Sequence, residues 1–301
     1  MTTDAAARAT WSTWGLLVLM GAAWGLEFSM LKLTAEAGYP PIGTLMAALA
    51  MVATAYWTVL IWRRAWFRVN CEVLLFLLMI AGLGYVLPLI AVLWAAPHVD
   101  AGLMTLIASF TPIVTVATAV LFRTETVSWR RILAVMIGLA SALLVLVPQA
   151  HLPEAGILGW LLLVFVVPLT YGVESVYVSV YWPQGLTPLQ IGAGQSLVAL
   201  LAVIPIHFLT EDPMVYDRGW NMGQIAIVIV AACLLVEVVL YFVIIRDTGG
   251  VLVSFGMYLS LFAGIAWGVI IFAERFDALT WLAVAVLVIG LSLTMPRRQQ
   301  S

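Results

Sequence analysis

Charged residues are scarce in this chain of 301 residues. Asp, Glu, Lys and Arg together make up 9% of it, and hydrophobic residues make up 64%. Soluble domains contain about 25% charged and about 45–50% apolar residues. The mean hydropathy is +1.11. This lack of charge argues against a soluble globular domain and indicates a protein embedded in a lipid bilayer.

Cysteine, strand-like alternation and long polar linkers are also lacking. The two cysteines, Cys71 and Cys233, lie far apart in or beside apolar runs, so no disulfide framework is indicated. The alternating pattern of a transmembrane β-barrel is absent. The longest connection between apolar runs, around 210–222, is too short for a soluble domain. The sequence therefore predicts an all-α membrane protein.

Long apolar runs recur along almost the whole chain. A helix that crosses roughly 30 Å of hydrocarbon needs about 18 or more such residues. On this basis we predict ten transmembrane helices. They lie near residues 13–33, 41–62, 73–95, 100–122, 130–148, 157–181, 188–209, 223–245, 250–273 and 278–295.

The basic residues predict the orientation of these helices. With a cytoplasmic N-terminus, the inside segments hold Arg8, Arg63, Arg64, Arg68, Arg123, Arg130, Arg131, Arg246, Arg297 and Arg298, and the outside segments hold Lys32, Arg218 and Arg275. This distribution follows the positive-inside rule. We therefore predict a bacterial-type inner-membrane protein whose N- and C-termini are both cytoplasmic.

The chain also repeats itself. The residues at 24–28, Trp-Gly-Leu-Glu-Phe, return 147 positions later at 171–175 as Tyr-Gly-Val-Glu-Ser. At the same spacing, Gly-Tyr-Pro-Pro at 38–41 returns as Gly-Leu-Thr-Pro at 185–188. Five helices per half is an odd number, so the second half must run upside down relative to the first. We predict two inverted five-helix repeats, an arrangement common in secondary transporters, over residues 1–150 and 151–301.

Several of these segments resemble one family. Trp24-Gly25-Leu26-Glu27-Phe28, followed by Lys32, resembles the opening motif of the drug/metabolite transporter superfamily, EamA type. The stretches 100–112 and 125–131 look like its helix-four to helix-five signature, and 249–275 is similar to the matching signature of the second half. Leu261 replaces the proline usual there, and Glu27 stands where many relatives have an uncharged residue. The resemblance implies a ten-helix exporter or exchanger of small metabolites with a central cavity between the halves.

Three carboxylates lie within predicted helices: Glu27, Glu174 and Glu237. An ionised carboxylate at the centre of a membrane helix costs on the order of 3 kcal/mol on insertion scales. Each group must therefore face a wet cavity, pair with a cation, or be protonated. Glu27 and Glu174 occupy matching positions of the two repeats, so we predict that they bind a cationic group or a coupling proton, with Glu237 as the next candidate. The alternative is a structural carboxyl group that is hydrogen-bonded to a neighbouring helix.

An aromatic ring lies about one helical turn from each glutamate. Residues three or four apart share a helix face, and a carboxylate beside aromatic faces suits an organic cation. We therefore predict a pocket lined by Trp24, Tyr171 and Tyr241, with Tyr85, Trp94 and Tyr177 as further lining residues. In a chain with 34 aromatic residues, calculated as 13 Trp, 9 Tyr and 12 Phe, packing or a place in the interfacial belt is the competing interpretation.

Other features complete the predicted site. Lys32, near the outer end of the first helix, either extends to the membrane interface or serves as a counter-ion for Glu27. Small-xxx-small patterns at Gly21–Gly25 and Gly264–Gly268 predict close helix packing, although such pairs also arise by chance. The histidines have no metal-ligand spacing. We therefore expect a site built from helices 1, 3, 4, 6, 8 and 9 that needs no metal and no cofactor.

These observations favour one function among several classes. No convergent set of catalytic residues lies within the spans, so an intramembrane enzyme or an assembly factor is the weakest alternative. We predict a secondary transporter, an exporter or exchanger, that moves a small cationic or zwitterionic solute (an amino acid, an amine or a quaternary ammonium) by alternating access with proton coupling. The runner-up is an exporter of neutral or aromatic metabolites whose carboxylates are structural. The expected partners are the solute, protons and the lipid bilayer, with no nucleic acid; the oligomeric state stays open.

Overall fold

A computed structural model describes most of the chain as helix. The described residues are 11–95, 98–99, 104, 107–124, 128–146, 158–210, 221–272 and 278–292, and no strand occurs within them. The first half contains α1 (Trp11–Glu36), α2 (Pro41–Trp62), α3 (Cys71–Ala81), the π-helix η2 (Gly82–Val86), α4 (Leu87–Ala95), α6 (Thr111–Leu121) and α7 (Trp129–Leu146). The second half contains α8 (Leu158–Val164), α9 (Val166–Tyr181), α10 (Pro188–Thr210), α11 (Met222–Thr248), α12 (Gly250–Ser254), α13 (Gly256–Phe272) and α14 (Ala278–Ser292).

Many of these helices can cross a bilayer. By length and composition, seven helical stretches in the described ranges qualify: Ser12–Ala35, Pro41–Trp62, Cys71–Ala95, Leu158–Tyr181, Pro188–Thr210, Met222–Thr248 and Gly250–Ile271. Thr111–Leu121 and Ala278–Gly290 are shorter apolar helices. The predicted all-α, multi-pass membrane protein is therefore confirmed, while the exact number of ten crossings stays a prediction.

Local sequence signals explain where the helices begin and end. Pro41 opens α2 and Pro188 opens α10, positions where the missing N–H of proline costs nothing. The Asn221 side chain caps α11 by accepting a hydrogen bond from the backbone N–H of Gln224 at 3.0 Å. Gly249, with a φ of 84°, separates α11 from α12. These signals place each helix close to its predicted apolar run.

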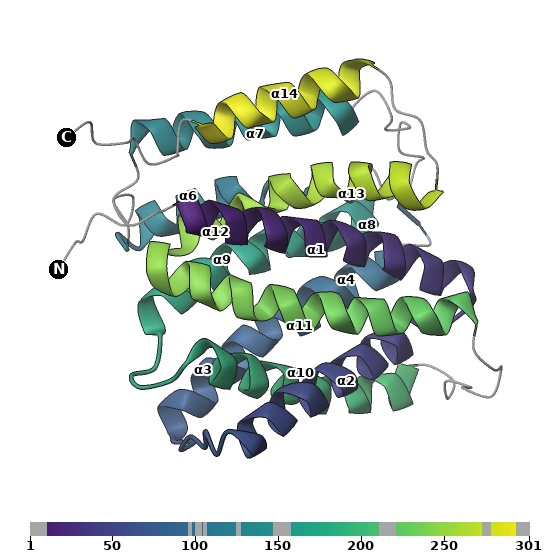
Figure 1. Ribbon diagram of the computed structural model, residues 1–301, viewed down its shortest axis with the longest axis vertical. Coiled ribbons are helices and arrows are strands. Elements are labelled where there is room, and N and C mark those ends of the chain that lie inside the picture. Colours follow the sequence, from purple (N-terminus) through teal and green to yellow (C-terminus); the bar gives the residue numbers. More distant parts are fainter. Residues whose placement is uncertain are drawn as a thin grey trace.

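The helices run roughly side by side across the view in Figure 1, and the α7–α14 pair lies at one edge of the bundle. The contacts of the two halves correspond. Helix α1 packs against α11 and α13, and α9, its equivalent in the second half, packs against α4 and α6. Helix α2 packs against α10, its own equivalent, as α7 does against α14. Exchanging the halves therefore turns one set of contacts into the other.

Glycines allow α1 and α13 to approach closely. A Cβ atom added at Gly25 would lie 2.6 Å from the backbone nitrogen of Gly264, and one at Gly21 would lie 2.6 Å from Cβ of Leu259. The indole N–H of Trp267 donates a hydrogen bond to the carbonyl of Ala22 at 2.9 Å. The predicted close packing at these patterns is confirmed.

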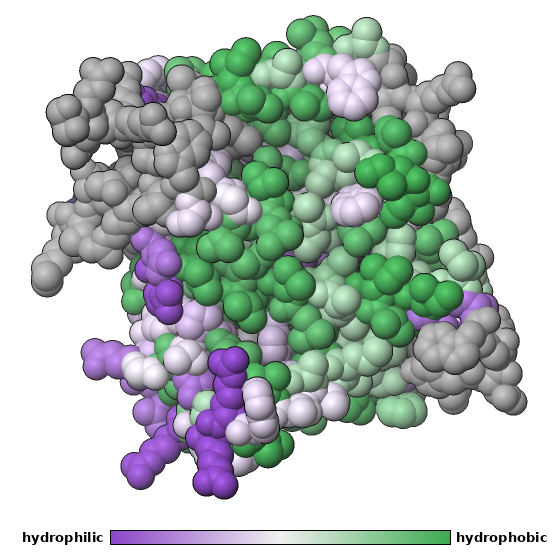
Figure 2. Space-filling model, viewed as in Figure 1, coloured by the Kyte–Doolittle hydropathy of each residue, from purple (hydrophilic) through white to green (hydrophobic). Residues whose placement is uncertain are grey.

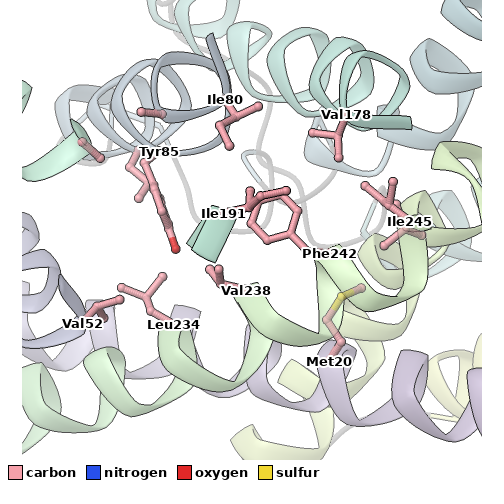
Figure 3. Close-up of a cluster of buried hydrophobic side chains, with 14 of the residues drawn as sticks. Met20, Val52, Ile80, Tyr85, Val178, Ile191, Leu234, Val238, Phe242 and Ile245 are labelled. Carbon is pink, nitrogen blue, oxygen red and sulfur yellow. The ribbon is translucent and has the colours of Figure 1, made fainter. Parts of the chain in front are cut away.

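Apolar side chains occupy both the inside and the outside of the bundle. Figure 3 shows side chains of several helices converging in the interior, among them Ile80, Ile191 and Phe242. On the surface in Figure 2, hydrophobic residues form a broad area, and hydrophilic residues gather toward one end. The connection between α2 and α3, which exposes Arg63, Arg64 and Arg68, is hydrophilic. An apolar flank with a polar end is the surface expected of a protein in a bilayer.

Candidate functional site

A central cavity lies among helices of both halves. The empty space between its lining atoms is about 760 Å³. Its walls come from the π-helix η2 and from helices α1, α4, α6, α9, α10, α11, α12 and α13. The lining residues are Trp24, Glu27, Gly84, Tyr85, Leu89, Thr111, Tyr171, Glu174, Ser175, Gln195, Leu234, Glu237, Val238, Tyr241, Val253, Ser254 and Met257.

Two of the three carboxyl groups meet across the α1–α11 contact. Glu27 and Glu237 are both buried, and their carboxyl groups lie close enough for a hydrogen bond between them. The indole N–H of Trp24 also approaches Glu237. Within the described ranges, Glu237 Oε2 has no hydrogen-bond donor from another side chain or backbone group. Two carboxyl groups form a hydrogen bond only when one of them carries a proton, because ionised carboxylates only accept.

The third carboxyl group, on α9, has different neighbours. Glu174 Oε1 accepts a hydrogen bond from Nε2 of Gln195 at 3.1 Å, and Oε2 accepts one from the hydroxyl of Tyr241 at 3.2 Å. Nε2 of Gln195 also donates to the carbonyl of Ile80 at 3.0 Å, which orients the amide. Both oxygens of Glu174 therefore accept from neutral donors, as an ionised carboxylate does.

Aromatic rings line the space between these carboxyl groups. Trp24 stacks on Tyr171 with ring centroids 6.5 Å apart and an interplanar angle of 21°. Trp24 also contacts the ring of Tyr241, with centroids 6.5 Å apart. Trp24 and Tyr171 occupy matching positions in the two repeats, so their contact joins equivalent points of α1 and α9. Negative charge beside aromatic faces provides the environment that organic cations favour.

A π-helical turn shapes the opposite wall. Within η2, Gly84 makes room for the acid, because a Cβ atom at this position would collide with Oε1 of Glu174 and lie 2.7 Å from Nε2 of Gln195. The turn also carries Tyr85, whose hydroxyl points toward Leu234 and Val238 of α11 in Figure 3. Within the described part of the chain, this buried hydroxyl has no hydrogen-bond partner. Single π-turns in α-helices frequently occur at functional sites.

The structure brings together seven of the ten predicted site residues. The cavity is lined by Glu27, Glu174, Glu237, Trp24, Tyr171, Tyr241 and Tyr85.

Two predicted lining residues lie elsewhere. Trp94 is on the outer surface of α4 and is 45% exposed. Tyr177 stacks on Phe76 of α3, with centroids 5.7 Å apart, and contacts Tyr181. The prediction that these two line the pocket is corrected, because each side chain leaves its helix on a face that points away from the cavity. The side chain of Lys32 lies outside the described residues, so its pairing with Glu27 stays a prediction.

The sequence analysis missed four polar lining residues: Gln195, Thr111, Ser175 and Ser254. Gln195 extends the site to α10, the seventh predicted span, which was not among the helices expected to form it. An amide in the middle of an apolar helix is costly to bury without a hydrogen-bond partner, although less so than a charged carboxylate, so this residue offers a usable signal. The three hydroxyl groups do not, since each can bond within its own helix: Ser175, for example, donates to the carbonyl of Gly172 at 3.1 Å.

Comparisons with known proteins agree with this arrangement. The model of the EamA-like transporter family matches the chain twice, over residues 12–147 and 158–295. The chain belongs to this family and is a membrane transporter of small solutes. A solved structure titled "Crystal structure of protein" is similar, with a TM-score of 0.75 and 17% identity, covering 92% of this chain and 96% of that one; it supports the fold alone. A search of the curated proteins finds no match.

Proposed function

We propose that this transporter moves a small cationic or zwitterionic organic solute, such as an amino acid, an amine or a quaternary ammonium, through the central cavity. The solute's ammonium group binds beside Glu174 and against the rings of Trp24, Tyr171 and Tyr241. One observation carries the proposal: three buried carboxyl groups from three helices converge on one aromatic-lined cavity. Within the described ranges, no basic side chain forms an ion pair with any of the three, and Arg246 pairs with Asp247 at the surface. A cationic solute is the partner that these groups lack.

The proposed architecture is that of two inverted five-helix repeats, residues 1–150 and 151–301, which open the cavity alternately to either side of the inner membrane. The double match of the family and the corresponding contacts of the two halves support it. The basic residues support cytoplasmic termini. We propose export in exchange for protons. The negative charge of a carboxyl group can be neutralised either by a proton or by a cationic solute, so one can replace the other.

A second candidate is the export of a neutral or aromatic metabolite. It is favoured by the hydrogen bonds of Glu174, because Gln195 and Tyr241 already satisfy one lone pair on each of its oxygens. In that case the carboxyl group fixes α9 against α10 and α11, and the stacked rings bind the solute. The two candidates differ in their need for a negative charge at position 174.

A binding screen on purified protein tests the proposal. Amines, amino acids and quaternary ammoniums are each paired with a neutral compound of the same shape, and thermal stabilisation is measured as a function of ligand concentration. We expect charged members to stabilise the protein and their neutral counterparts not to. The Glu174→Gln variant retains both neighbours and loses the charge, so it should lose this difference. Stabilisation by neutral compounds that is equal in the wild type and the variant would favour the second candidate.

Transport is then measured in proteoliposomes. Uptake of a stabilising compound is followed with and without a pH gradient, and protein-free liposomes serve as the control. We expect the gradient to drive accumulation and its collapse by an ionophore to abolish it. Uptake that is indifferent to the gradient would refute proton exchange while leaving the binding proposal intact.

A further inference from the structure

The central cavity contains two acidic centres that differ in chemistry. Glu174 contacts an amide and a phenol, each a neutral donor. Glu27 and Glu237 contact each other. The first arrangement needs no proton on the carboxyl group, whereas the second needs one proton between two groups. Repeat-equivalent positions 27 and 174 therefore hold carboxyl groups with different hydrogen-bond partners.

A second cavity lies beside Glu27, one member of the carboxyl pair. Its empty space is about 330 Å³, and Glu27 lines both this cavity and the central one. Glu174 does not line the second cavity. The other walls come mainly from Leu31, Leu45, Leu93 and Val230. These residues lie toward the end of the bundle where α1 ends and α2 and α11 begin, which is the predicted outer side.

Thr44 is a second polar residue beside this apolar space. Thr44 of α2 lines the second cavity and is 1% exposed. Within the described ranges, its hydroxyl oxygen has no hydrogen-bond partner. A buried hydroxyl without a partner is costly in an apolar setting. Thr44 is thus a second polar side chain beside Glu27, on the predicted outer side of the pair.

The surroundings of the pair contain no described cation. Among the titratable groups around it, Tyr85 comes from η2, Tyr171 from α9, Cys233 from α11 and Tyr56 from α2. The Tyr56 hydroxyl donates to the carbonyl of Leu235 at 2.6 Å. Glu174 across the cavity adds a further acidic group. Every one of these described groups is neutral or acidic, so none of them supplies a positive charge to the pair.

We propose that the Glu27–Glu237 pair is the proton-carrying site and that Glu174 is the ligand of the solute's cationic group. The proton reaches the pair from the predicted outer side, on which Thr44 and the second cavity lie beside Glu27. This inference rests on the proposed function and divides its two tasks between the acidic centres. Loss of the shared proton to water leaves two negative charges that face each other. An entering cation relieves that repulsion, which couples the two events.

Carbodiimide labelling tests the division without any solute. Dicyclohexylcarbodiimide is an apolar reagent that modifies protonated carboxyl groups. A nitrogen of the reagent takes up the acid's proton while the carboxyl oxygen adds to the central carbon of the carbodiimide. An ionised carboxylate has no proton to give and stays unmodified. The purified protein is treated at neutral pH, and peptide mass spectrometry measures the adduct at each glutamate. We expect adducts at Glu27 or Glu237 and none at Glu174. The exposed Glu72 of α3 serves as the control outside the cavity.

Two substitutions exchange the environments of the two centres. Glu27→Gln gives Glu237 an amide neighbour like that of Glu174, so the adduct at Glu237 should be lost. Gln195→Glu gives Glu174 an acidic neighbour like that of Glu237, so an adduct should appear at position 174 or 195. Size-exclusion chromatography checks that each variant is folded. If Glu27→Gln is not, Glu237→Gln makes the same test from the other side of the pair, with loss of the adduct expected at Glu27.

Labelling of wild-type Glu174 to the same extent as the pair, or an unlabelled pair, would overturn the inference. Neither result depends on transport, so a protein that transports a cation with the reversed labelling pattern would refute the division of roles and keep the proposed function. A protein that shows the expected labelling pattern but binds no cation would refute the proposed function and keep the difference between the two acidic centres.

Discussion

Replacing Gly84 by alanine tests whether the π-helical turn creates the space for Glu174. The added Cβ atom would collide with Oε1 of Glu174 and lie 2.7 Å from Nε2 of Gln195 and 2.8 Å from Cδ of Glu174. Real Cβ contacts are not this short, so the acid and the amide must both move. The 3.1 Å hydrogen bond between them then breaks or lengthens.

The cost follows from three terms. Overpacking a close-packed interior costs about 1–3 kcal/mol, and losing a hydrogen bond to a charged group costs about 1.5–3 kcal/mol. The higher helix propensity of alanine returns about 1 kcal/mol. We therefore expect Gly84→Ala to lower the free energy of unfolding by roughly 1.5–5 kcal/mol. If half of that strain falls on the solute site, cation affinity drops by about tenfold, since each tenfold corresponds to about 1.4 kcal/mol.

Gly82 provides a matched control in the same π-turn. No atom lies within 4 Å of a Cβ atom added there, so Gly82→Ala should be neutral or slightly stabilising. Thermal unfolding of both purified variants, followed by binding of the best cationic ligand, gives the comparison. If Gly84→Ala were as stable and as competent as Gly82→Ala, the idea that this glycine makes room for the acid would be wrong.

Further substitutions address other parts of the molecule. Gly25→Ala would push a methyl group into the backbone of α13 and should lower the melting temperature, at a cost of about 1–3 kcal/mol. Gly15→Ala is the control, because a Cβ atom there meets no atom within 4 Å. Equal melting temperatures of the two variants would contradict the close packing. Tyr241→Phe removes the donor to Oε2 of Glu174 and should cost on the order of 1.5–3 kcal/mol of stability, measured by chemical unfolding; no loss would mean that the bond contributes nothing. Trp94→Ala should leave transport unchanged, because this side chain lies outside the cavity, and a large loss of flux would show that the lining is incomplete.

Much of the fold could be predicted from apolar runs alone. A helical stretch occurs within each predicted span, because the length needed to cross a bilayer leaves little freedom in placing helix ends. The convergence of Glu27 and Glu174 could also be anticipated, since the cost of a charge in hydrocarbon and the repeat both single out these positions.

The finer features of the site depend on helix rotation, which a single sequence does not encode locally. Tyr177 is three residues from Glu174 and was expected on the same face, yet its ring packs on α3. The contact of Glu27 with Glu237 joins residues 210 positions apart and is set by how α1 lies on α11. The π-turn that places Tyr85 shifts the register of its helix. None of these follows from spacing along one helix.

The two repeats differ at one aligned position beside their acids. Position 195 in the second half corresponds to position 48 in the first, at the spacing of 147 residues. Gln195 fills the space beside Glu174, whereas Ala48, whose side chain is a methyl group, lines the small apolar cavity beside Glu27. Because both halves belong to one polypeptide, each can carry its own residue at an aligned position. One acid therefore has a companion amide and the other has a hollow beside it, so the two halves of this transporter are unequal where they meet.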